Sequence, residues 1–301
     1  MTEQTRTFRD KWLEAVDRKN SVLCAGLDPA EFAMGRGEKG LPQGVDKIWW
    51  AEEYINAVAP FCAAVKPNYQ YWKSRDGEVA LYHIHGMAHS RGLVVIDDSK
   101  LADIGSTNDA GVYSAARRAD AVTFSPFAGN LEEATQQAHA RGIGLISMVL
   151  MSNPEYEREK NKLVPLNEDE ACSEYYMEEV IRVSESGGCP YVKQYIQLAH
   201  DARKFGTDGI VIGAPSDKNH ITDKEISRVR NYVEGDALVL LPGVGAQGGE
   251  AGAIWREFGK DDVIVNVGRS LMLPKGSKST PAQQAEAAKQ YRDMLNEKRG
   301  V

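Results

Sequence analysis

Residues 94–108 read VVIDDSKLADIGSTN, a short apolar run that passes directly into charged side chains. The run at 93–97 (LVVID) is rich in β-branched residues and does not alternate with polar ones, which is typical of a strand buried on both faces. Seven further runs share this character and lie at residues 21–27, 61–65, 121–124, 144–150, 209–212, 237–241 and 263–267. The sequence therefore predicts eight buried strands.

Longer amphipathic segments separate these runs. Helices are predicted at residues 47–59, 77–89, 129–139, 168–185, 223–232 and 246–258, with one more at each end, 6–18 and 281–298. Asn130 and Thr222 are candidate N-caps. Buried strands alternating with helices favour a parallel α/β fold, and eight of them favour a (β/α)8 TIM barrel in a single domain, residues 1–301. The extra N-terminal helix could cover the bottom of such a barrel; an open doubly wound sheet is the competing architecture.

The composition narrows the class of protein. The chain has 301 residues, with 36 Lys and Arg against 43 Asp and Glu and a formal net charge of −7. This acidic balance argues against a general nucleic-acid-binding surface, which needs a basic face. No secretory signal stands at the N-terminus, and the longest apolar stretch, 144–151, is far shorter than a membrane span. Four cysteines without C-x-x-C spacing fit a reducing compartment, so a cytoplasmic protein is expected.

Polar and charged side chains collect where the predicted strands end. The residues at these positions are Asp28, Lys66, Asp98, Lys100, Ser152, the segment 242–249, Gly268 and Arg269. Barrel enzymes build their active sites at the carboxyl ends of the strands, and the loops after the seventh and eighth strands commonly hold a phosphate. Because six strand ends carry such groups, an active site is predicted at this end of the barrel.

The strongest motif is Asp98-x-Lys100-x-x-Asp103. In an extended chain residues i and i+2 face the same way, so Asp98 and Lys100 are predicted to project together. A lysine between carboxylates stays protonated, because opposite charges within about 4–6 Å favour its charged form. Such a lysine is a poor Schiff-base nucleophile and a good proton donor, and Lys66 would extend the row of alternating charges. The alternative is a solvated loop with chance spacing.

The loop Gly243-Val-Gly245-Ala-Gln-Gly248 formally matches the G-x-G-x-x-G pattern after a strand. Too little chain follows it for a Rossmann domain, and the next strand ends in Gly268-Arg269 instead of an acidic residue. Backbone amides together with Arg269 suit a phosphate monoester better than a dinucleotide. A purely structural turn is the other alternative.

Three histidines, His83, His85 and His89, lie close together in the predicted helix at 77–89. They lie away from every predicted strand end. Surface or helix-packing roles are therefore favoured over a metal site, and no metal is predicted.

The motifs at these strand ends, taken together, resemble orotidine 5′-monophosphate decarboxylase. They are GLDP with Asp28, AVKPN with Lys66, the Asp98–Asp103 motif, VGAQGG at 244–249 and VGRS at 267–270, in the family's order. The resemblance implies a homodimeric (β/α)8 barrel with active sites at the subunit interface. It implies a carboxy-lyase that converts orotidine monophosphate to uridine monophosphate and CO2, in the last step of de novo pyrimidine synthesis, with no metal or organic cofactor.

The resemblance also implies a charged catalytic array of Lys66, Asp98, Lys100 and Asp103. Asp103 and Thr107 would come from the partner subunit and touch the ribose. Lys100 would stabilise the negative charge that develops at C6 of the pyrimidine, and would then protonate that carbon.

The remaining residues of the resemblance would bind the substrate. Asp28, together with Lys66, would bind ribose hydroxyls, and Ser152 would hydrogen-bond the pyrimidine. Pro242 would line the pocket. The residues implied to hold the phosphate are Gln247, Gly268 and Arg269.

The sequence departs from the commonest family pattern in two places. Gly105-Ser106 stands where many members have Pro-Asn, although Thr107 keeps its offset. The stretches 29–44 and 153–167 are longer than a minimal member needs, and the first is rich in glycine.

Three other functions are open to this sequence. One is a magnesium-dependent keto-gulonate phosphate decarboxylase, which resembles the Asp-x-Lys-x-x-Asp core. Another is a class I aldolase that uses a strand-end lysine as a Schiff base, although the flanking carboxylates argue against it. The third is a non-catalytic nucleotide sensor with a preserved pocket.

Overall fold

The eight predicted strands close into one parallel barrel in the computed structural model, which describes residues 6–74, 76–172, 179–182, 188–233, 235, 237–245 and 248–301. The strands are β1 Leu23–Leu27, β2 Ala64–Pro67, β3 Val94–Leu101, β4 Ala121–Phe124, β5 Gly144–Leu150, β9 Gly209–Ile212, β10 Leu238–Pro242 and β11 Val263–Val267. They are hydrogen-bonded in the closed order β1-β11-β10-β9-β5-β4-β3-β2. The TIM-barrel prediction is confirmed, and the open doubly wound sheet is excluded.

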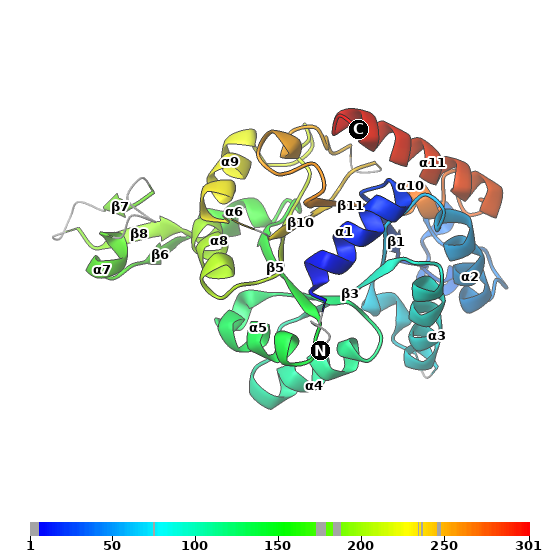
Figure 1. Ribbon diagram of the computed structural model, residues 1–301, viewed down its shortest axis with the longest axis horizontal. Helices are drawn as coiled ribbons and strands as arrows, with labels where there is room; N and C mark the ends of the chain where they lie inside the picture. Colours follow the sequence, from blue (N-terminus) through cyan, green and yellow to red (C-terminus); the bar gives the residue numbers. More distant parts are fainter. Residues whose placement is uncertain are drawn as a thin grey trace, which may run out of the picture.

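Helices surround the barrel (Figure 1). They are α2 Lys47–Val58, α3 Gly77–Ser90, α4 Gly105–Ala116, α5 Leu131–Ala140, α8 Gln194–Lys204, α9 Asp223–Tyr232, α10 Arg269–Met272 and α11 Pro281–Lys298. Single 3-10 turns form at η1 Phe32–Met34, η2 Gly37–Lys39, η3 Tyr69–Trp72, η4 Pro126–Ala128 and η5 Ile254–Arg256. Thr222 caps α9 in a capping box with Glu225, as predicted. Asn130 precedes α5, but its side chain does not cap that helix.

The first helix, α1 Phe8–Lys19, packs against the amino-terminal end of the barrel. Phe8 and Trp12 are buried there, and the Trp12 Nε1–H donates to the carbonyl oxygen of Asp261 at 2.7 Å. A Cβ on Gly144, the first residue of β5, would lie 2.7 Å from the Cβ of Phe8, so glycine gives the helix its close approach. The predicted extra helix therefore closes the end opposite the strand-end polar residues.

A small antiparallel sheet projects from the barrel beside α8 (Figure 1). Its strands β6 Leu163–Pro165, β7 Ile181–Arg182 and β8 Pro190–Lys193 pair in the order β6-β8-β7, with the short helices α6 Tyr156–Lys160 and α7 Glu168–Ala171 beside them. The prediction of a helix over 168–185 is wrong: α7 ends at Ala171, and β7 pairs with β8. Cross-strand pairing decides the conformation at 181–182, and residues 173–178 and 183–187 lie outside the described range.

The predicted helix over 246–258 is also wrong, because only the single turn η5 forms in its described part. Gly248 has φ +72°, which interrupts a right-handed helix. A Cβ on Gly249 would lie 2.6 Å from the carbonyl oxygen of Gly243, so the chain folds back tightly on the end of β10. Backbone crowding thus overrides the apolar spacing of this segment.

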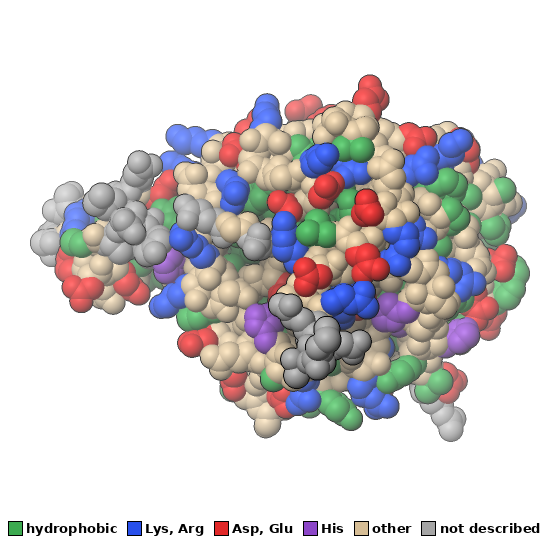
Figure 2. Space-filling model, viewed as in Figure 1, with side chains coloured by type: hydrophobic (Ala, Val, Ile, Leu, Met, Phe, Trp, Pro, Cys, Tyr) green, Lys and Arg blue, Asp and Glu red, His purple; other side chains and the backbone are tan. Residues whose placement is uncertain are grey.

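The surface that carries α1 is evenly mixed in charge. Figure 2 shows Lys and Arg side chains interspersed with Asp and Glu over this face, without a continuous basic patch. None of the helices in the described ranges is long and apolar enough to cross a membrane.

Asp120 ties α1 and α3 to the barrel. Its carboxylate accepts a hydrogen bond from the Val95 N–H at 2.9 Å, contacts His89 Nε2 at 2.8 Å and pairs with Lys11 Nζ at 3.0 Å. Burial acts to raise the pKa of Asp120, but these donors outweigh it and lower the pKa to about 2.

We expect Asp120→Asn to lower the free energy of unfolding by about 2 kcal/mol at pH 7. Because the pKa is lower in the folded than in the unfolded state, the carboxylate's contribution is present above about pH 4 and is lost as the pH falls toward 2. Urea denaturation at pH 7 and pH 3 measures the loss of unfolding free energy. The control is Asp17→Asn, at an exposed position of α1. An equal loss at both pH values would contradict this account.

Candidate active site

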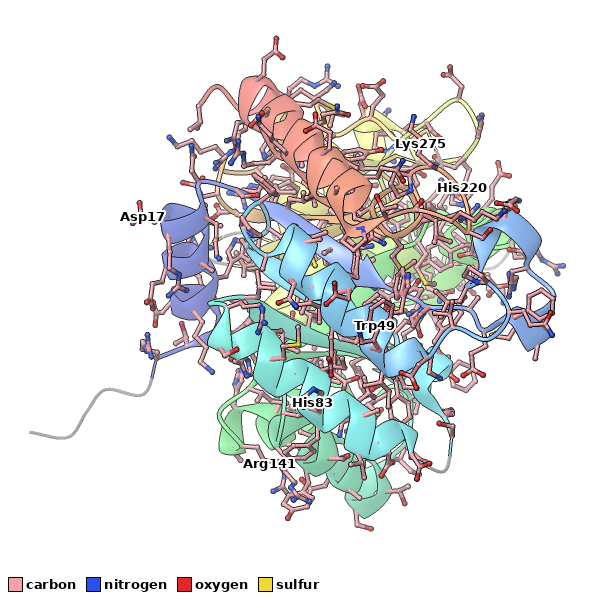
Figure 3. The ribbon with its side chains drawn as sticks, turned by 90° about the vertical axis from the view of Figure 1, so that its right-hand side faces the viewer. Asp17, Trp49, His83, Arg141, His220 and Lys275 are labelled. Atoms are coloured by element: carbon pink, nitrogen blue, oxygen red, sulfur yellow. The ribbon has the colours of Figure 1, made fainter. Side chains whose placement is uncertain are left out.

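A cavity of about 290 Å³ opens at the carboxyl ends of the barrel strands. The predicted site residues that line it are Asp28, Lys66, Asp98, Lys100, Pro242, Gly268 and Arg269. Figure 3 shows His220 and Lys275 on this side of the barrel and Asp17 of α1 at the opposite end. The strand-end residues are therefore brought together from β1, β2, β3, β10 and β11, as their positions in the sequence predict.

Asp98 lies between two lysines. Its Oδ2 accepts a hydrogen bond from Lys66 Nζ, and its Oδ1 accepts one from Lys100 Nζ at 2.5 Å. Lys66 and Asp98 are buried, whereas the Lys100 side chain is 45% exposed and lines the cavity. The predicted row of alternating charges is present as Lys66–Asp98–Lys100.

The charged forms of this cluster are mutually stabilising. Burial acts to raise the pKa of Asp98, but Lys66 and Lys100 outweigh it and hold that pKa well below its usual range. Burial acts to lower the pKa of Lys66, but Asp98 and Asp28 outweigh it and raise that pKa above its usual value. The cavity therefore presents fixed ammonium groups around one carboxylate.

Lys100 has an unusual backbone conformation, with φ +50°. Its N–H donates to Thr123 Oγ1 at 2.9 Å, and the Thr123 hydroxyl donates to Asp98 Oδ1 at 3.0 Å. The register of β3 against β4 shifts between Asp97 and Leu101, so the strand is irregular at this point. Asp98 and Lys100 do project together as predicted, but from an irregular part of β3 and not from a regular extended chain.

Asp28 and Asn266 leave two acceptors open at the cavity wall. Asp28 Oδ1 and Asn266 Oδ1 are buried atoms without a hydrogen-bond partner in the described part of the chain. Burial raises the pKa of Asp28, although Lys66 opposes that shift. A buried acceptor without a donor is unfavourable. These two atoms therefore suit a ligand that carries hydroxyl donors.

The residues that directly follow β10 and β11 form the other wall of the cavity. Gly243 and Gly245 have φ +100° and +92°. Gly268 approaches β1 so closely that a Cβ on Gly26 would lie 2.8 Å from its Cα, and Arg269 begins α10 beside it. Arg269 places a cationic side chain on this wall. Gln247 lies outside the described residues.

Asp103 and Thr107 are not part of this cavity within one chain. Both are exposed, and the Asp103 carbonyl oxygen accepts a hydrogen bond from Asn130 Nδ2 at 3.0 Å. Near them, Ile104 is 59% exposed and Phe127 is 90% exposed. Among the described residues of one chain, the Lys100 ammonium is bonded to one carboxylate, that of Asp98.

Ser152 stands just beyond β5 but does not line the cavity. It packs against Gly213, where a Cβ would lie 2.6 Å from the Ser152 Cβ. The structure therefore places Ser152 at the predicted end of the barrel without bringing it to the cluster.

The three neighbouring histidines contact different partners. His83 pairs with Glu52, the ring of buried His85 contacts the Arg118 carbonyl oxygen, and His89 pairs with Asp120. No group of three metal-ligating side chains is found within the ranges that the structure describes.

Several residues of the cavity were missed by the sequence analysis. They are Ala30, Arg36, Lys39, Asn68, Tyr71, Asn266 and Met272 on its wall, and Thr123 behind it. Asn68 could have been found, because it follows Lys66 by two positions at a strand end. Arg36 and Lys39 had no such signal, since they belong to the long loop at 29–44.

Comparison with known proteins agrees with these motifs. A model of the orotidine 5′-phosphate decarboxylase / HUMPS family matches residues 21–288. An orotidine 5′-phosphate decarboxylase of Paracidovorax citrulli is 32% identical over 306 residues, covering 98% of this chain and all of the relative. One from Variovorax paradoxus is 30% identical over 298 residues, covering 96% of this chain and 98% of the relative.

Solved structures show the same fold at lower identity. The Leishmania donovani OMP decarboxylase has a TM-score of 0.71 and 22% identity, covering 98% of this chain and all of that one. The orotidine 5′-monophosphate decarboxylase of Methanocaldococcus jannaschii, complexed with the inhibitor BMP, has a TM-score of 0.61 and 21% identity, covering 91% and 98%. The resemblance drawn from the motifs is confirmed: the chain belongs to the orotidine 5′-phosphate decarboxylase / HUMPS family.

Proposed function

We propose that this protein is a carboxy-lyase that converts orotidine 5′-monophosphate to uridine 5′-monophosphate and CO2 in de novo pyrimidine synthesis, without a metal or organic cofactor. The observation that carries the proposal is the Lys66–Asp98–Lys100 cluster at the cavity, in a chain whose curated relatives are named for this activity. Residues 1–301 act as one barrel domain. A cytoplasmic location is proposed because all four cysteines are free thiols.

The cluster supports an electrostatic mechanism. Loss of CO2 breaks the bond between C6 and the carboxylate carbon and leaves the electron pair on C6. The Lys100 ammonium stabilises this carbanion, because preorganised charge acts most strongly where charge develops. Lys100 then gives its proton to C6 and is reprotonated from water. Asp98 holds Lys100 in place.

The other cavity residues are proposed to bind the nucleotide. Asp28, whose Oδ1 has no partner in the described chain, and Lys66 bind ribose hydroxyls. Pro242 lines the cavity. Ser152 lies at the same end of the barrel but outside the cavity lining, and it is proposed to hydrogen-bond the pyrimidine. The residues proposed to hold the phosphate are Gln247, Gly268 and Arg269.

A spectrophotometric assay with orotidine monophosphate and a chelator tests the activity. Turnover that survives chelation supports the proposal and excludes the magnesium-dependent alternative. Tight binding of uridine monophosphate without turnover would identify a nucleotide sensor instead. Borohydride trapping of substrate on the protein would identify a Schiff-base aldolase.

We propose a homodimer in which Asp103 of the partner subunit supplies the second carboxylate beside Lys100. Thr107 of the partner subunit would then touch the ribose. Two exposed apolar side chains support this: Ile104 follows Asp103 directly, and Phe127 lies in the turn before Asn130, whose Nδ2 bonds the Asp103 carbonyl oxygen.

Phe127→Glu is expected to yield a monomer with about 100-fold lower turnover, because Lys100 loses a charged neighbour. The protomer should keep its thermal stability, since this side chain is 90% exposed in the single chain. Light scattering and steady-state kinetics measure both effects. Trp49→Glu, on the exposed side of α2 (Figure 3), is the control and should remain dimeric. A monomer with full turnover would refute the shared site.

Thr123 is predicted to position the catalytic lysine through its hydroxyl. Thr123→Val keeps the shape but removes both hydrogen bonds, and it should lower kcat about tenfold with little change in KM. Thr123→Ser should restore most of the loss. The control is Thr135→Val, whose equally buried hydroxyl donates to the Leu131 carbonyl oxygen within α5. Equal kcat values for the Thr123→Val and Thr135→Val variants would rule out this role.

A further inference from the structure

The loop between β1 and α2 is folded back on itself. The Leu41 N–H donates to the carbonyl oxygen of Ala30 at 2.7 Å, which joins the two ends of the segment 30–41. The turns η1 and η2 lie within it. A Cβ on Gly40 would lie 2.9 Å from the Ala30 oxygen, so glycine permits this closure. Segment 30–41 is thus a compact loop of the Ω type, with a defined shape of its own.

A second contact fastens this loop to the far end of the chain. Glu38 Oε2 accepts hydrogen bonds from the Ser277 N–H at 3.1 Å and from the Ser277 hydroxyl at 2.9 Å. A Cβ on Gly276, which has φ +80°, would lie 2.6 Å from the same oxygen. Ser277 follows α10, the helix that begins with Arg269. The contact therefore holds η2 against the segment that follows β11.

This anchoring places two cations on the cavity wall. Arg36 and Lys39 stand on either side of the anchored Glu38 and line the same cavity as Arg269. Figure 3 shows the segment between β1 and α2 projecting at the end of the barrel opposite α1.

The cavity has an excess of positively charged side chains, which indicates an anionic ligand. Lys66 and Lys100 share Asp98. The side chains of Arg36, Lys39 and Arg269 have no hydrogen-bond or ion-pair partner among the residues that the structure describes. Three such cations gather at one place in a chain of net charge −7. A ligand with a dianionic group would neutralise them.

We propose that Arg36 and Lys39 bind the phosphate of the nucleotide together with Arg269, so that the loop 30–41 is part of the substrate site. This inference rests on the proposed function of the cavity. Because the loop is fixed at its neck and at Glu38, little ordering is needed when the phosphate binds. The phosphate lies far from the reacting carbon, so this binding supplies affinity that can support the chemical step.

The test compares uridine monophosphate with uridine, which lacks the phosphate. Arg36→Ala and Lys39→Ala should each raise the Kd of uridine monophosphate, and the KM of orotidine monophosphate, about tenfold, and the double variant more. The Kd of uridine should not change. The increase in Kd for Arg269→Ala serves as the reference for the loss of one phosphate contact. Lys260→Ala is the matched control, because it removes the same charge from an exposed position near α1.

Ser277→Ala tests the anchor without changing any charge. It removes the hydroxyl donor to Glu38, and we expect a Kd for uridine monophosphate about threefold higher, with uridine again unaffected. Circular dichroism melting checks that each variant is folded, and the exposed positions of Arg36 and Lys39 make truncation compatible with folding.

The outcomes separate the two proposals. A wild-type protein that binds the nucleotide but does not decarboxylate it overturns the proposed function, whatever the loop variants do. A wild-type protein that turns over, with a double variant matching Lys260→Ala in its Kd for uridine monophosphate, overturns the role of the loop alone. Equal losses for uridine and uridine monophosphate also overturn it, because the contact would then not involve the phosphate.

Discussion

Lys100→Ala is expected to reduce kcat by about 10⁴-fold or more, because it removes both the charge that stabilises the carbanion and the proton donor. The side chain is bonded to Asp98 and is open to the cavity, so no other group takes its place. Lys66 is buried against the other oxygen of the same carboxylate. Single-turnover assays with orotidine monophosphate measure the loss.

Lys100→Arg separates the two roles of the lysine. A guanidinium keeps the positive charge but does not give up a proton at neutral pH, so this variant should also be almost inactive. Binding of uridine monophosphate should stay within about tenfold of wild type in both variants, since the phosphate wall is untouched. An active Lys100→Ala protein would refute the proposed mechanism.

The barrel could be predicted because each of its strands is recognisable from its own local sequence. Runs such as 144–150 and 263–267 are continuously apolar, and burial on both faces requires that pattern. The prediction failed where distant contacts decide the local structure. The segment 168–185 depends on pairing with β8, and 246–258 depends on the tight return at Gly249. The helices α4 and α8 were not predicted at all.

Those residues of the site that come directly after a strand could be predicted from the sequence. Asp28, Lys66 and Arg269 were found because a barrel brings the ends of its strands together. Thr123 was missed, since its role depends on how β4 registers against the irregular end of β3. Arg36 was missed because Glu38 and Ser277, which hold its loop in place, lie 239 residues apart in the sequence.

Asp98→Asn is expected to have the second largest effect, on both turnover and stability. The buried Lys66 loses its main partner, and breaking a buried ion pair in this way costs about 3–5 kcal/mol. Because the pKa of Asp98 is lowered on folding, its stabilising contribution is present above the unfolded pKa and is lost as the pH falls through the folded value. The difference in unfolding free energy between wild type and variant should therefore shrink in strong acid.

The turnover of Asp98→Asn should fall about 10³-fold, because Lys100 is no longer held in place by a carboxylate. Asp97→Asn is the matched control. Asp97 is equally buried and pairs with Arg118 at 2.7 Å, but it does not line the cavity. Both variants should lose stability, as urea denaturation will show, whereas only Asp98→Asn should lose most of its kcat at a temperature where both are folded. Similar kcat values in the two variants would mean that Asp98 acts only through stability, and the electrostatic role assigned to it would fail.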